Sequence, residues 1–348
     1  MADKWLITGG CGFIGANLAA SLLDDGVEVV ALDDLSRIGS AENLAWLRER
    51  SGRVKRGRFT HLRADTSRQE QVEAALSEHR NGLTAVAHLA GQVAMTTSIA
   101  APRRDFEVNA LGALNVLEAV RAHAPEAVVL FSSTNKVYGD LAALRHVEAG
   151  TRWTLPDHPA GLDESLPMSF HTPYGCSKGT ADQYVLDYHR TYGLRASVFR
   201  HSSIYGGRQF ATFDQGWVGW FTEQVLTGKH FTISGDGKQV RDLLHAEDLV
   251  ACYRLGAAQI DACMGRAFNI GGGMNNSLSL IELFAKLERL TGKKASFELI
   301  PWRASDQKVF VADTRAARDA FGWMPEVGCD EGLRRMVEWV RSTMSAMP

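Results

Sequence analysis

The sequence has few cysteines and no long apolar run. Its five cysteines are odd in number, and no two of them form a C-x-x-C pair. This pattern argues against a disulfide framework or a zinc site, so we expect a reducing, cytoplasmic compartment and no bound metal. No apolar run approaches the ~18 residues that span a bilayer, and the N-terminus lacks the pattern of a secretory signal. We therefore expect no membrane partner.

An excess of charge of one sign is also missing. The chain has 348 residues, of which 38 are Lys or Arg and 40 are Asp or Glu, giving a formal net charge of −2. Proteins that bind the phosphate backbone of nucleic acids normally carry a clear basic excess, so we expect no nucleic-acid partner. Hydrophobic residues make up 45% and charged residues 22%, as in globular proteins. The length predicts about two domains.

The sequence does contain a regular alternation of short apolar runs with helical patterns. The runs that predict strands are Lys4–Thr8, Val27–Asp33, Phe59–Asp65, Ala85–Ala90, Ala127–Ser132 and Ala196–Arg200. Because parallel strands need crossover connections, strands separated by helices predict an α/β fold with a doubly wound parallel sheet. Ligands of such sheets bind beyond the carboxyl ends of the strands.

The alternation changes after Tyr205, where glycine, aromatic and polar residues become frequent. Helical patterns return at Glu247–Ala258 and at Ser277–Leu290. We interpret the later part as a smaller α/β domain, with one return of the chain to the large sheet. The predicted division assigns residues 1–204 plus 241–272 to the first domain and residues 205–240 plus 273–348 to the second.

A glycine-rich turn, TGGCGFIG, lies between the first strand and a helix and contains Gly9, Gly12 and Gly15. Glycines there let the backbone approach a pyrophosphate, and the helix N-terminus offers it free N–H donors. Asp33 ends the second strand, where its carboxylate would bond both ribose hydroxyls and repel a 2′-phosphate. The pattern predicts a dinucleotide site that favours NAD over NADP, whereas the nearby Arg37 would suit a 2′-phosphate.

Polar residues follow the next strands. Asp65 and Thr66 come just after the third strand, where they would bond an adenine edge or simply form a turn. His88 ends the fourth strand and is either a ligand or a buried structural histidine. Asn109 lies in a helical segment and needs polar partners, which a purely structural bond would equally supply.

Tyr174 and Lys178 stand four residues apart at the start of a predicted helix, so they share one face of it. The ammonium group should lower the pKa of the phenol and make Tyr174 a base near neutral pH. Thr134 follows the fifth strand at the same sheet edge, where its hydroxyl would share the proton moving between substrate and Tyr174. The three residues predict a catalytic set.

Together these motifs resemble the extended short-chain dehydrogenase/reductases, in the branch of NAD-dependent sugar-nucleotide epimerases and dehydratases. The resemblance rests on TGGCGFIG, HLAG, SSTNKVYG, YGCSK, RHSSIYGGR and GDGKQVRDLLHAED, and it spans about residues 4 to 313. It implies tightly held NAD and catalysis by Thr134, Tyr174 and Lys178. Besides the glycines and the Tyr–Lys pair, the NAD contacts that it implies are Phe13, Ile14, Asp33, Ser36, Arg37, Asp65, Thr66, Leu89, Ala90, Gln92, Asn109, and His201 or Ser202.

The resemblance also separates the reactions of the family. Its dehydratases carry Asp-Glu after the catalytic Thr, whereas this chain has Asn135 and Lys136. An amide is no general acid and an ammonium group accepts no proton, so dehydration is disfavoured. Epimerisation remains, by oxidation to a keto sugar and return of the hydride to the opposite face. The residues predicted to bind the nucleotide sugar are Thr134, Asn135, Ser203, Arg208, Gln209, Arg241, Arg303 and Asp306.

The resemblance is greatest to members that invert C2 of a CDP-linked sugar, which predicts a CDP-sugar as the substrate. Inversion at C4 of another nucleotide hexose is the alternative within the family. A non-catalytic NAD-binding sensor is the alternative outside it, and the intact Thr134, Tyr174 and Lys178 disfavour it. Family members usually pair through the helix that carries Tyr and Lys, here Tyr174–Tyr188, so we expect a homodimer or homotetramer.

Two further segments have open interpretations. Residues 140–169 would either fold over the sugar or form an ordinary surface excursion. Trp217 and Trp220 lie three residues apart and would either pack in the core or stack on a base or sugar.

Overall fold

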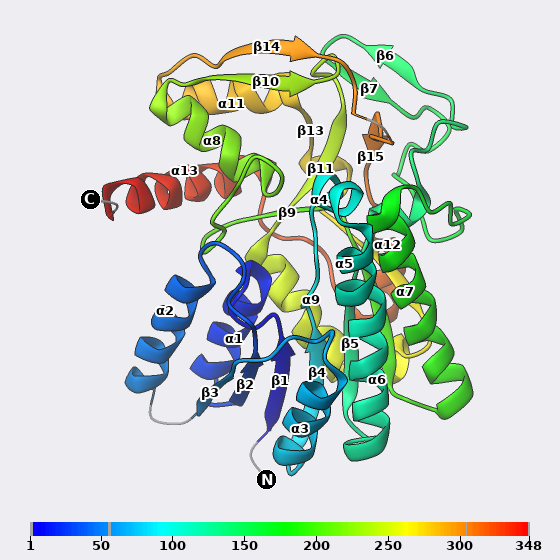
Figure 1. Cartoon of the computed structure of the whole chain (residues 1–348). Helices are drawn as coiled ribbons and strands as arrows, with labels where there is room; N and C mark the ends of the chain where they lie inside the picture. The colour runs from blue at the N-terminus through cyan, green and yellow to red at the C-terminus, as the bar shows by residue number, and fades with distance from the viewer. Residues whose placement is uncertain (1–2, 55–56, 304, 347–348) are drawn as a thin grey trace.

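The computed structural model describes residues 3–54, 57–303 and 305–346. It has two parts, a large sheet covered by helices and a smaller assembly of short strands and helices at one end of that sheet (Figure 1). The chain passes between the two parts more than once. Within the described residues, no helix has the length and apolar character needed to cross a membrane.

The large sheet has seven strands, and every neighbouring pair is parallel. In spatial order the strands are β12 (Ala267–Ile270), β8 (Ala196–His201), β5 (Val128–Thr134), β4 (Leu83–His88), β1 (Lys4–Thr8), β2 (Glu28–Leu32) and β3 (Phe59–Leu62). The predicted doubly wound parallel sheet is confirmed. The six predicted strands are all present, with ends that differ by at most three residues.

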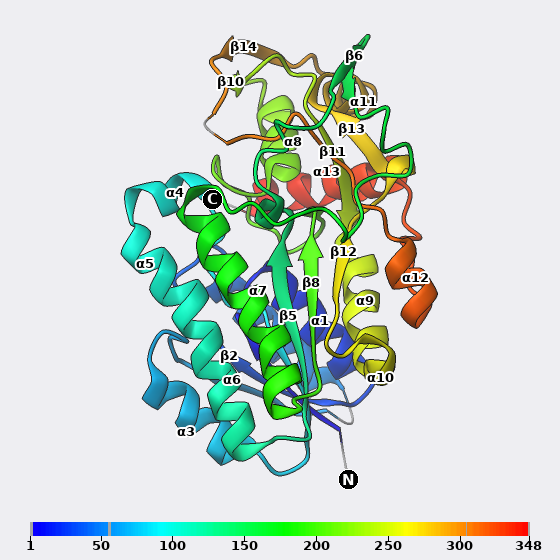
Figure 2. The ribbon, with the colours of Figure 1, turned by 90° about the vertical axis from the view of Figure 1, so that its right-hand side faces the viewer.

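Helices cover both faces of this sheet (Figure 2). One face carries α3 (Gln69–His79), α6 (Gly112–His123) and α7 (Thr172–Tyr192). The other carries α1 (Phe13–Asp24), α2 (Ser40–Arg53), α9 (Ala246–Ala258), α10 (Ile260–Cys263) and α12 (Arg315–Phe321). Shorter helical turns are α4 (Met95–Ala100), α5 (Pro102–Phe106), η1 (Glu107–Leu111), η2 (Asn135–Tyr138) and η3 (Met274–Asn276).

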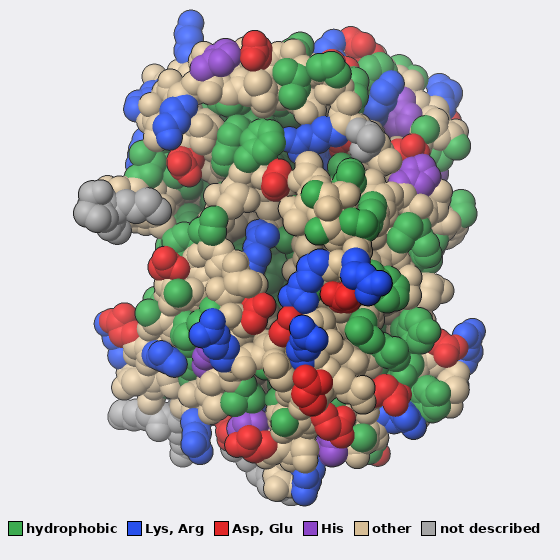
Figure 3. All heavy atoms as spheres, in the orientation of Figure 1, with side chains coloured by type: hydrophobic (Ala, Val, Ile, Leu, Met, Phe, Trp, Pro, Cys, Tyr) green, Lys and Arg blue, Asp and Glu red, His purple; other side chains and the backbone are tan. Residues whose placement is uncertain are grey.

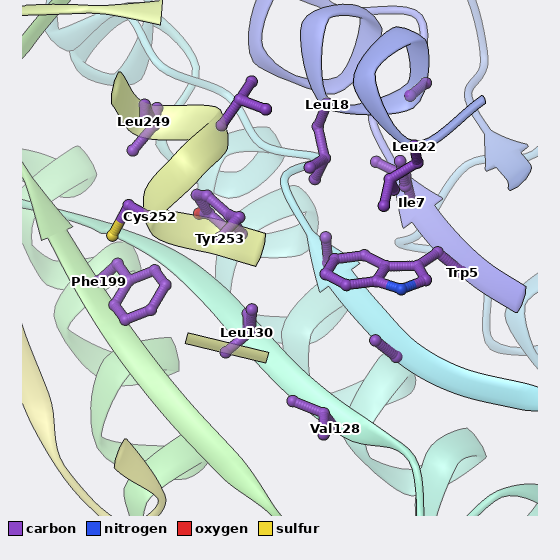
Figure 4. Close-up of a cluster of buried hydrophobic side chains, with 14 of the residues drawn as sticks. Trp5, Ile7, Leu18, Leu22, Val128, Leu130, Phe199, Leu249, Cys252 and Tyr253 are labelled. Atoms are coloured by element: carbon purple, nitrogen blue, oxygen red, sulfur yellow. The ribbon is translucent and has the colours of Figure 1, made fainter. Parts of the chain in front are cut away.

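Strand β1 shows why the sheet needs helices on both sides. Leu6 packs in the cluster under α3, α6 and α7, whereas its neighbour Ile7 packs in the cluster under α1 and α9. Successive side chains of a strand point to opposite faces, so an unbroken apolar run must be covered twice. The cluster under α1 and α9 also contains Trp5 of β1, Leu18 of α1 and Tyr253 of α9 (Figure 4).

The smaller part is built around β11 (Val240–His245), which pairs with strands on both sides. Its other elements are β9 (Ser203–Tyr205), β10 (His230–Ser234), β13 (Ser277–Ser279), β14 (Ser296–Ile300), β15 (Val309–Phe310), α8 (Trp217–Thr227), α11 (Leu280–Thr291) and α13 (Cys329–Ala346). The helix predicted from Ser277 begins at Leu280 instead. Ser279 caps it, because its hydroxyl accepts the Glu282 N–H at 3.2 Å and the Glu282 carboxylate accepts the Ser279 N–H at 2.9 Å.

The chain alternates between the two parts more finely than the predicted division. Strand β11, assigned to the first domain from residue 241, pairs with β9, β13 and β15 of the smaller part. Conversely, Phe321 of α12 and the following Trp323, assigned to the second domain, pack in the core beside the large sheet. The boundaries of the predicted division remain a prediction.

Residues 140–169 pack against the smaller part. They contain a hairpin of β6 (Val147–Ala149) and β7 (Arg152–Thr154). Arg152 Nε donates to Glu282 Oε1 at 2.8 Å, and the Trp153 indole N–H donates to Asp236 at 2.8 Å. The hairpin is therefore held by polar contacts far from the carboxyl ends of the central strands.

Candidate active site

The glycine-rich turn between β1 and α1 has no room for a side chain at Gly9 or Gly15. A Cβ on Gly9, which has φ of +67°, would lie 2.8 Å from the Ala90 backbone nitrogen, and one on Gly15 would overlap the Gly9 carbonyl oxygen. The cap residue of α1 is Gly12, so no side chain bonds the first N–H groups of the helix. These donors and the helix dipole form a seat for a pyrophosphate.

Asp33 lies just beyond β2, and two backbone bonds orient its carboxylate. The Cys11 N–H donates to Oδ2 at 2.9 Å and the Leu35 N–H donates to Oδ1 at 2.8 Å. The side chain is buried, which raises its pKa, whereas the two backbone bonds favour the charged form. Each oxygen keeps a free lone pair, as a group that accepts from two ribose hydroxyls requires.

A cavity runs along this sheet edge, and most of the predicted cofactor residues line it. Those residues are Gly9, Gly12, Phe13, Ile14, Gly15, Asp33, Ser36, Arg37, Asp65, Thr66, Leu89, Ala90 and Gln92. Ser40, Asn43, Phe210 and Gln215 also line it and were not predicted. Phe210 and Gln215 come from a segment about 200 residues further along the chain, so no local motif marks them.

Asn109 lies behind this cavity, not in its lining. It sits in η1, where the helix widens by one residue, and its amide exchanges two bonds with the backbone of Gln92, both at 3.0 Å. Its Nδ2 also lies 3.1 Å from the Ser177 hydroxyl on α7. Asn109 therefore fixes a wall of the cavity to the helix that carries Tyr174. A widened turn of this kind often marks a functional site.

Thr134, Tyr174 and Lys178 lie close together, as the motif predicted. Thr134 ends β5, its hydroxyl donates to Asn135 Oδ1 at 3.4 Å, and it lies near enough to the Tyr174 phenol to affect the pKa of that group. The Lys178 ammonium lies 4.4 Å from the centre of the Phe131 ring and faces Gly91, where a Cβ would be 3.6 Å from Nζ. All three side chains are buried.

The predicted direction of the Tyr174 pKa is wrong for this chain. Burial raises the pKa of Tyr174 to about 12, the nearby Thr134 hydroxyl opposes the rise, and the Asp105 carboxylate adds to it. Burial also lowers the pKa of Lys178 to about 8, against the attraction of Asp105 and Asp182. The sequence shows that Tyr174 and Lys178 are four residues apart, but it does not show that both side chains are shielded from water. This burial is the largest cause of both pKa shifts.

A second cavity opens beside the first, and Val93 lines both. It lies between the two parts of the molecule, where Lys and Arg side chains surround a hollow (Figure 3). The predicted residues in its lining are Asn135, Tyr174, Ser202, Ser203, Arg241, Arg303 and Asp306. No residue of the 140–169 segment lines it.

Three cationic side chains surround one carboxylate in this lining. Arg241 Nη2 donates to Asp306 at 2.8 Å, and Lys136 Nζ lies 3.6 Å from the same oxygen. Although burial acts in the opposite direction, Arg241 and Lys136 hold the pKa of Asp306 below its usual value. The third cation, Arg303, donates to the Ser234 hydroxyl at 3.1 Å. An excess of fixed positive charge remains, which suits a diphosphate.

Further predicted site residues lie elsewhere than expected, and Thr134 and Lys178 line neither cavity. Arg208 and Gln209, predicted for the substrate, line the first cavity. Ser202, predicted for the cofactor, lines the second and donates to the buried Asp242 carboxylate. His201 lines neither cavity, and its ring nitrogens lie 3.3 Å from the Ser132 and Tyr253 hydroxyls. His201 is the last residue of β8, and Ser202, Arg208 and Gln209 follow it. The chain leaves the large sheet there, so successive side chains point to different cavities.

Trp217 and Trp220 pack in the core, as one of the two interpretations predicted, and stacking on a base or sugar stays a prediction. Both line the second cavity, and both pack against the apolar core of the smaller part. The Trp217 indole N–H donates to the Ser203 hydroxyl at 3.2 Å, and the Trp220 ring meets Phe213 edge-on at 5.3 Å. They form an aromatic wall of the cavity.

The two buried histidines near the site predict a pH-dependent stability. Burial lowers the pKa of His88 and of His201 to about 3, with Lys178 adding to the effect. Because the folded-state pKa lies below the ~6.5 of an unfolded chain, this stabilisation is complete above pH ~6.5 and is lost as the pH falls towards 3. At pH 5 each histidine should cost about 2 kcal/mol of unfolding free energy relative to pH 7.

Urea unfolding at pH 7 and pH 5 measures this loss. His88→Gln should show a smaller difference between the two pH values than the unchanged protein. His230→Gln, at an exposed position on β10, should keep the full difference. Equal pH dependence in the unchanged protein and in His88→Gln would contradict the assignment.

The comparisons with known proteins agree with this geometry. A family model described as GDP-mannose 4,6 dehydratase matches residues 6–336. The chain belongs to this family of extended short-chain dehydrogenase/reductases.

The chain is similar to CDP-paratose 2-epimerase of Salmonella typhi, with 49% identity over 344 residues that cover 97% of this chain and 99% of that protein. Among solved structures, UDP-glucose 4-epimerase of Thermotoga maritima with UDP-glucose has 30% identity and a TM-score of 0.81, covering 98% of this chain and 99% of that one. UDP-glucose 4-epimerase of Thermus thermophilus in complex with NAD has 31% identity and a TM-score of 0.79, with 97% and 99% covered.

Proposed function

We propose that this protein is an NAD-dependent isomerase that interconverts CDP-paratose and CDP-tyvelose by inverting C2 of the sugar. The observation that carries the proposal is the junction of the two cavities, which share Val93 and place Tyr174 in the wall of the second. A dinucleotide seat thus adjoins a cation-lined cavity of the kind that a nucleotide sugar needs. The choice of a CDP-sugar is supported by the 49% identity to CDP-paratose 2-epimerase.

The first cavity fits NAD on three counts. The uncapped N-terminus of α1 would receive the pyrophosphate, and glycines leave the backbone open to it. Asp33, fixed by the Cys11 and Leu35 N–H groups, would accept from the adenosine ribose. Bound NAD supplies the chemistry that no side chain offers, which is to accept a hydride from a carbinol carbon and give it back.

The residues of the chain handle the proton. A sugar carbon with no neighbouring carbonyl has a C–H that is not acidic, so direct removal and return of its proton would be too slow. Oxidation to a ketone avoids this step. Tyr174 takes the proton of the substrate hydroxyl and later returns it, and the nearby Thr134 hydroxyl would share that proton. Lys178, one helical turn away on α7, is the cation placed to stabilise the phenolate against the burial that raises the pKa of Tyr174.

The second cavity must hold the nucleotide diphosphate while the keto sugar turns its other face. Arg241 and Arg303 are suited to the diphosphate, because guanidinium groups bind phosphate oxygens with paired donors. Asp306 fixes the orientation of Arg241 through their 2.8 Å bond. Asn135 and Lys136 offer no acid–base pair for dehydration. The Asn135 amide is held in place because its Nδ2 donates to the Gln307 side chain at 3.2 Å.

Product analysis by NMR tests the proposal. Incubation of the purified protein with CDP-paratose carrying deuterium at C2 should give CDP-tyvelose that keeps the label in the same molecule. UDP-, GDP- and dTDP-hexoses in parallel reactions should give little product. Inversion at C4 of a UDP-hexose would assign the protein to the alternative 4-epimerase function, and loss of the label to water would contradict oxidation and hydride return.

We also place the enzyme in the cytoplasm as a homodimer or homotetramer that supplies dideoxyhexose for surface polysaccharide, such as a lipopolysaccharide O-antigen. Support for pairing comes from the outer face of α7, where Tyr184 and Tyr192 are 45% and 50% exposed. The five thiols are unpaired, which suits a reducing compartment.

A further inference from the structure

A short segment after β9 crosses from the smaller part onto the first cavity. We call Gly207–Phe210 the clasp. The Asn17 side chain on α1 donates to the Gly207 carbonyl at 3.0 Å. The Asn43 side chain on α2 donates to the Arg208 carbonyl at 3.3 Å and to the Cys11 carbonyl of the glycine-rich turn at 3.1 Å. One amide therefore joins the clasp directly to the pyrophosphate seat.

The Arg208 side chain is held on several sides. Its Nε donates to Asn43 Oδ1 at 2.9 Å, and Nη2 donates to the Glu42 carbonyl at 3.2 Å. The guanidinium carbon lies 4.6 Å from the centre of the Trp46 ring on α2 and 5.1 Å from that of Trp339 on α13. Arg208 has φ of +66°, a backbone conformation that a residue with a side chain adopts only when its contacts enforce it.

The other clasp residues are also anchored. The Phe210 ring lies directly against Gly39, which has φ of +85°, and a Cβ there would overlap the ring. The Trp339 indole N–H donates to the Gln209 carbonyl at 3.3 Å. Contacts from α1, α2 and α13 thus meet on four consecutive residues, three of which line the first cavity.

We propose that Arg208 is a positioning residue that keeps NAD resident by locking the clasp across the first cavity. The proposal rests on NAD as the cofactor of the proposed function, but not on the identity of the sugar. An epimerase needs this retention. If the reduced cofactor left before the return step, the sugar would remain a ketone, having lost a hydride to NAD⁺ and a proton to the solvent.

Cofactor retention, measured without any sugar, tests the proposal. Arg208→Ala should be purified with less than half the NAD content of the unchanged protein, and it should exchange bound NAD for labelled NAD at least ~10-fold faster. Trp339→Leu removes a contact of Arg208 that does not line the cavity, and it should speed exchange in the same direction. Arg334 is an exposed residue of α13, the helix that carries Trp339, and Arg334→Ala should leave the NAD content and the NAD exchange rate unchanged.

Each other outcome overturns the inference. Unchanged exchange in Arg208→Ala and Trp339→Leu would remove the role of the clasp. Faster exchange in Arg208→Ala alone would make Arg208 a direct ligand and not a positioning residue. Should Arg208→Ala fail to fold, NAD exchange is measured in Arg208→Lys and Trp339→Leu instead. Both should exchange NAD faster, since Lys keeps the cation but not the paired donors. Failure of the C2 reaction would leave these measurements untouched, so the two proposals are separable.

Discussion

Replacing Tyr174 with Phe should lower kcat by ~10³-fold while leaving the NAD content unchanged. The substitution removes a single oxygen from a buried ring and keeps its packing on α7. In the proposed mechanism that oxygen takes the proton of the substrate hydroxyl, with the Thr134 hydroxyl nearby. Turnover is measured by NMR of the sugar products, and the cofactor is measured after denaturation of the protein.

Two comparisons make this result specific. Tyr192→Phe removes the hydroxyl of a half-exposed tyrosine at the end of the same helix and should leave kcat unchanged. Thr134→Ser keeps the shared hydroxyl and should retain most activity, whereas Thr134→Val should lose it. A Tyr174→Phe variant within tenfold of the unchanged enzyme would show that another group is the base.

Replacing Asp182 with Asn should destabilise the fold by about 3–5 kcal/mol, because it leaves the buried Arg200 guanidinium without its counter-charge. The two side chains form paired bonds of 2.9 Å at 0% and 6% exposure, and Ser133 donates to the same carboxylate at 2.7 Å. The pair ties α7 to β8 and, through Ser133, to β5, the elements that carry the predicted catalytic residues Thr134 and Lys178. Urea unfolding should therefore show a clearly lower midpoint, and kcat should fall with it.

The matched control is Asp187→Asn on the exposed face of α7, where the partner is the solvated Arg190. It should leave the urea midpoint nearly unchanged, because water and salt screen exposed ion pairs. Removing both charges in Asp182→Asn/Arg200→Met should recover much of the lost stability, since the unpaired charge is then absent. Equal stability of Asp182→Asn and the unchanged protein would mean that water reaches Arg200.

The glycine-rich turn and the Tyr–Lys pair show what local sequence specifies. Gly15 is required by the turn itself, because a Cβ there would overlap the Gly9 carbonyl oxygen, and Gly9 has φ of +67°, which favours glycine. Tyr174 and Lys178 share a helix face because four residues make about one turn. The strands were equally predictable, since an apolar run between turn residues is a property of the segment.

The departures from prediction concern contacts between distant segments. Arg208 lies on the first cavity because Asn43 and Trp46, more than 160 residues earlier, receive its side chain. Ser202 turns to the second cavity because Asp242 accepts its hydroxyl. No motif within either segment records these partners.

The sequence by itself determined the parallel sheet, the dinucleotide turn and the shared helix face of Tyr174 and Lys178, because each depends on residues close together in the chain. Only the tertiary structure decided which cavity each loop residue lines, how the clasp crosses the glycine-rich turn, and that burial raises the pKa of Tyr174. The physical reason is that burial and long-range contact come into existence when the chain packs. The burial of the Tyr174 phenol and the position of Arg208 between α2 and α13 therefore could not be predicted from the sequence.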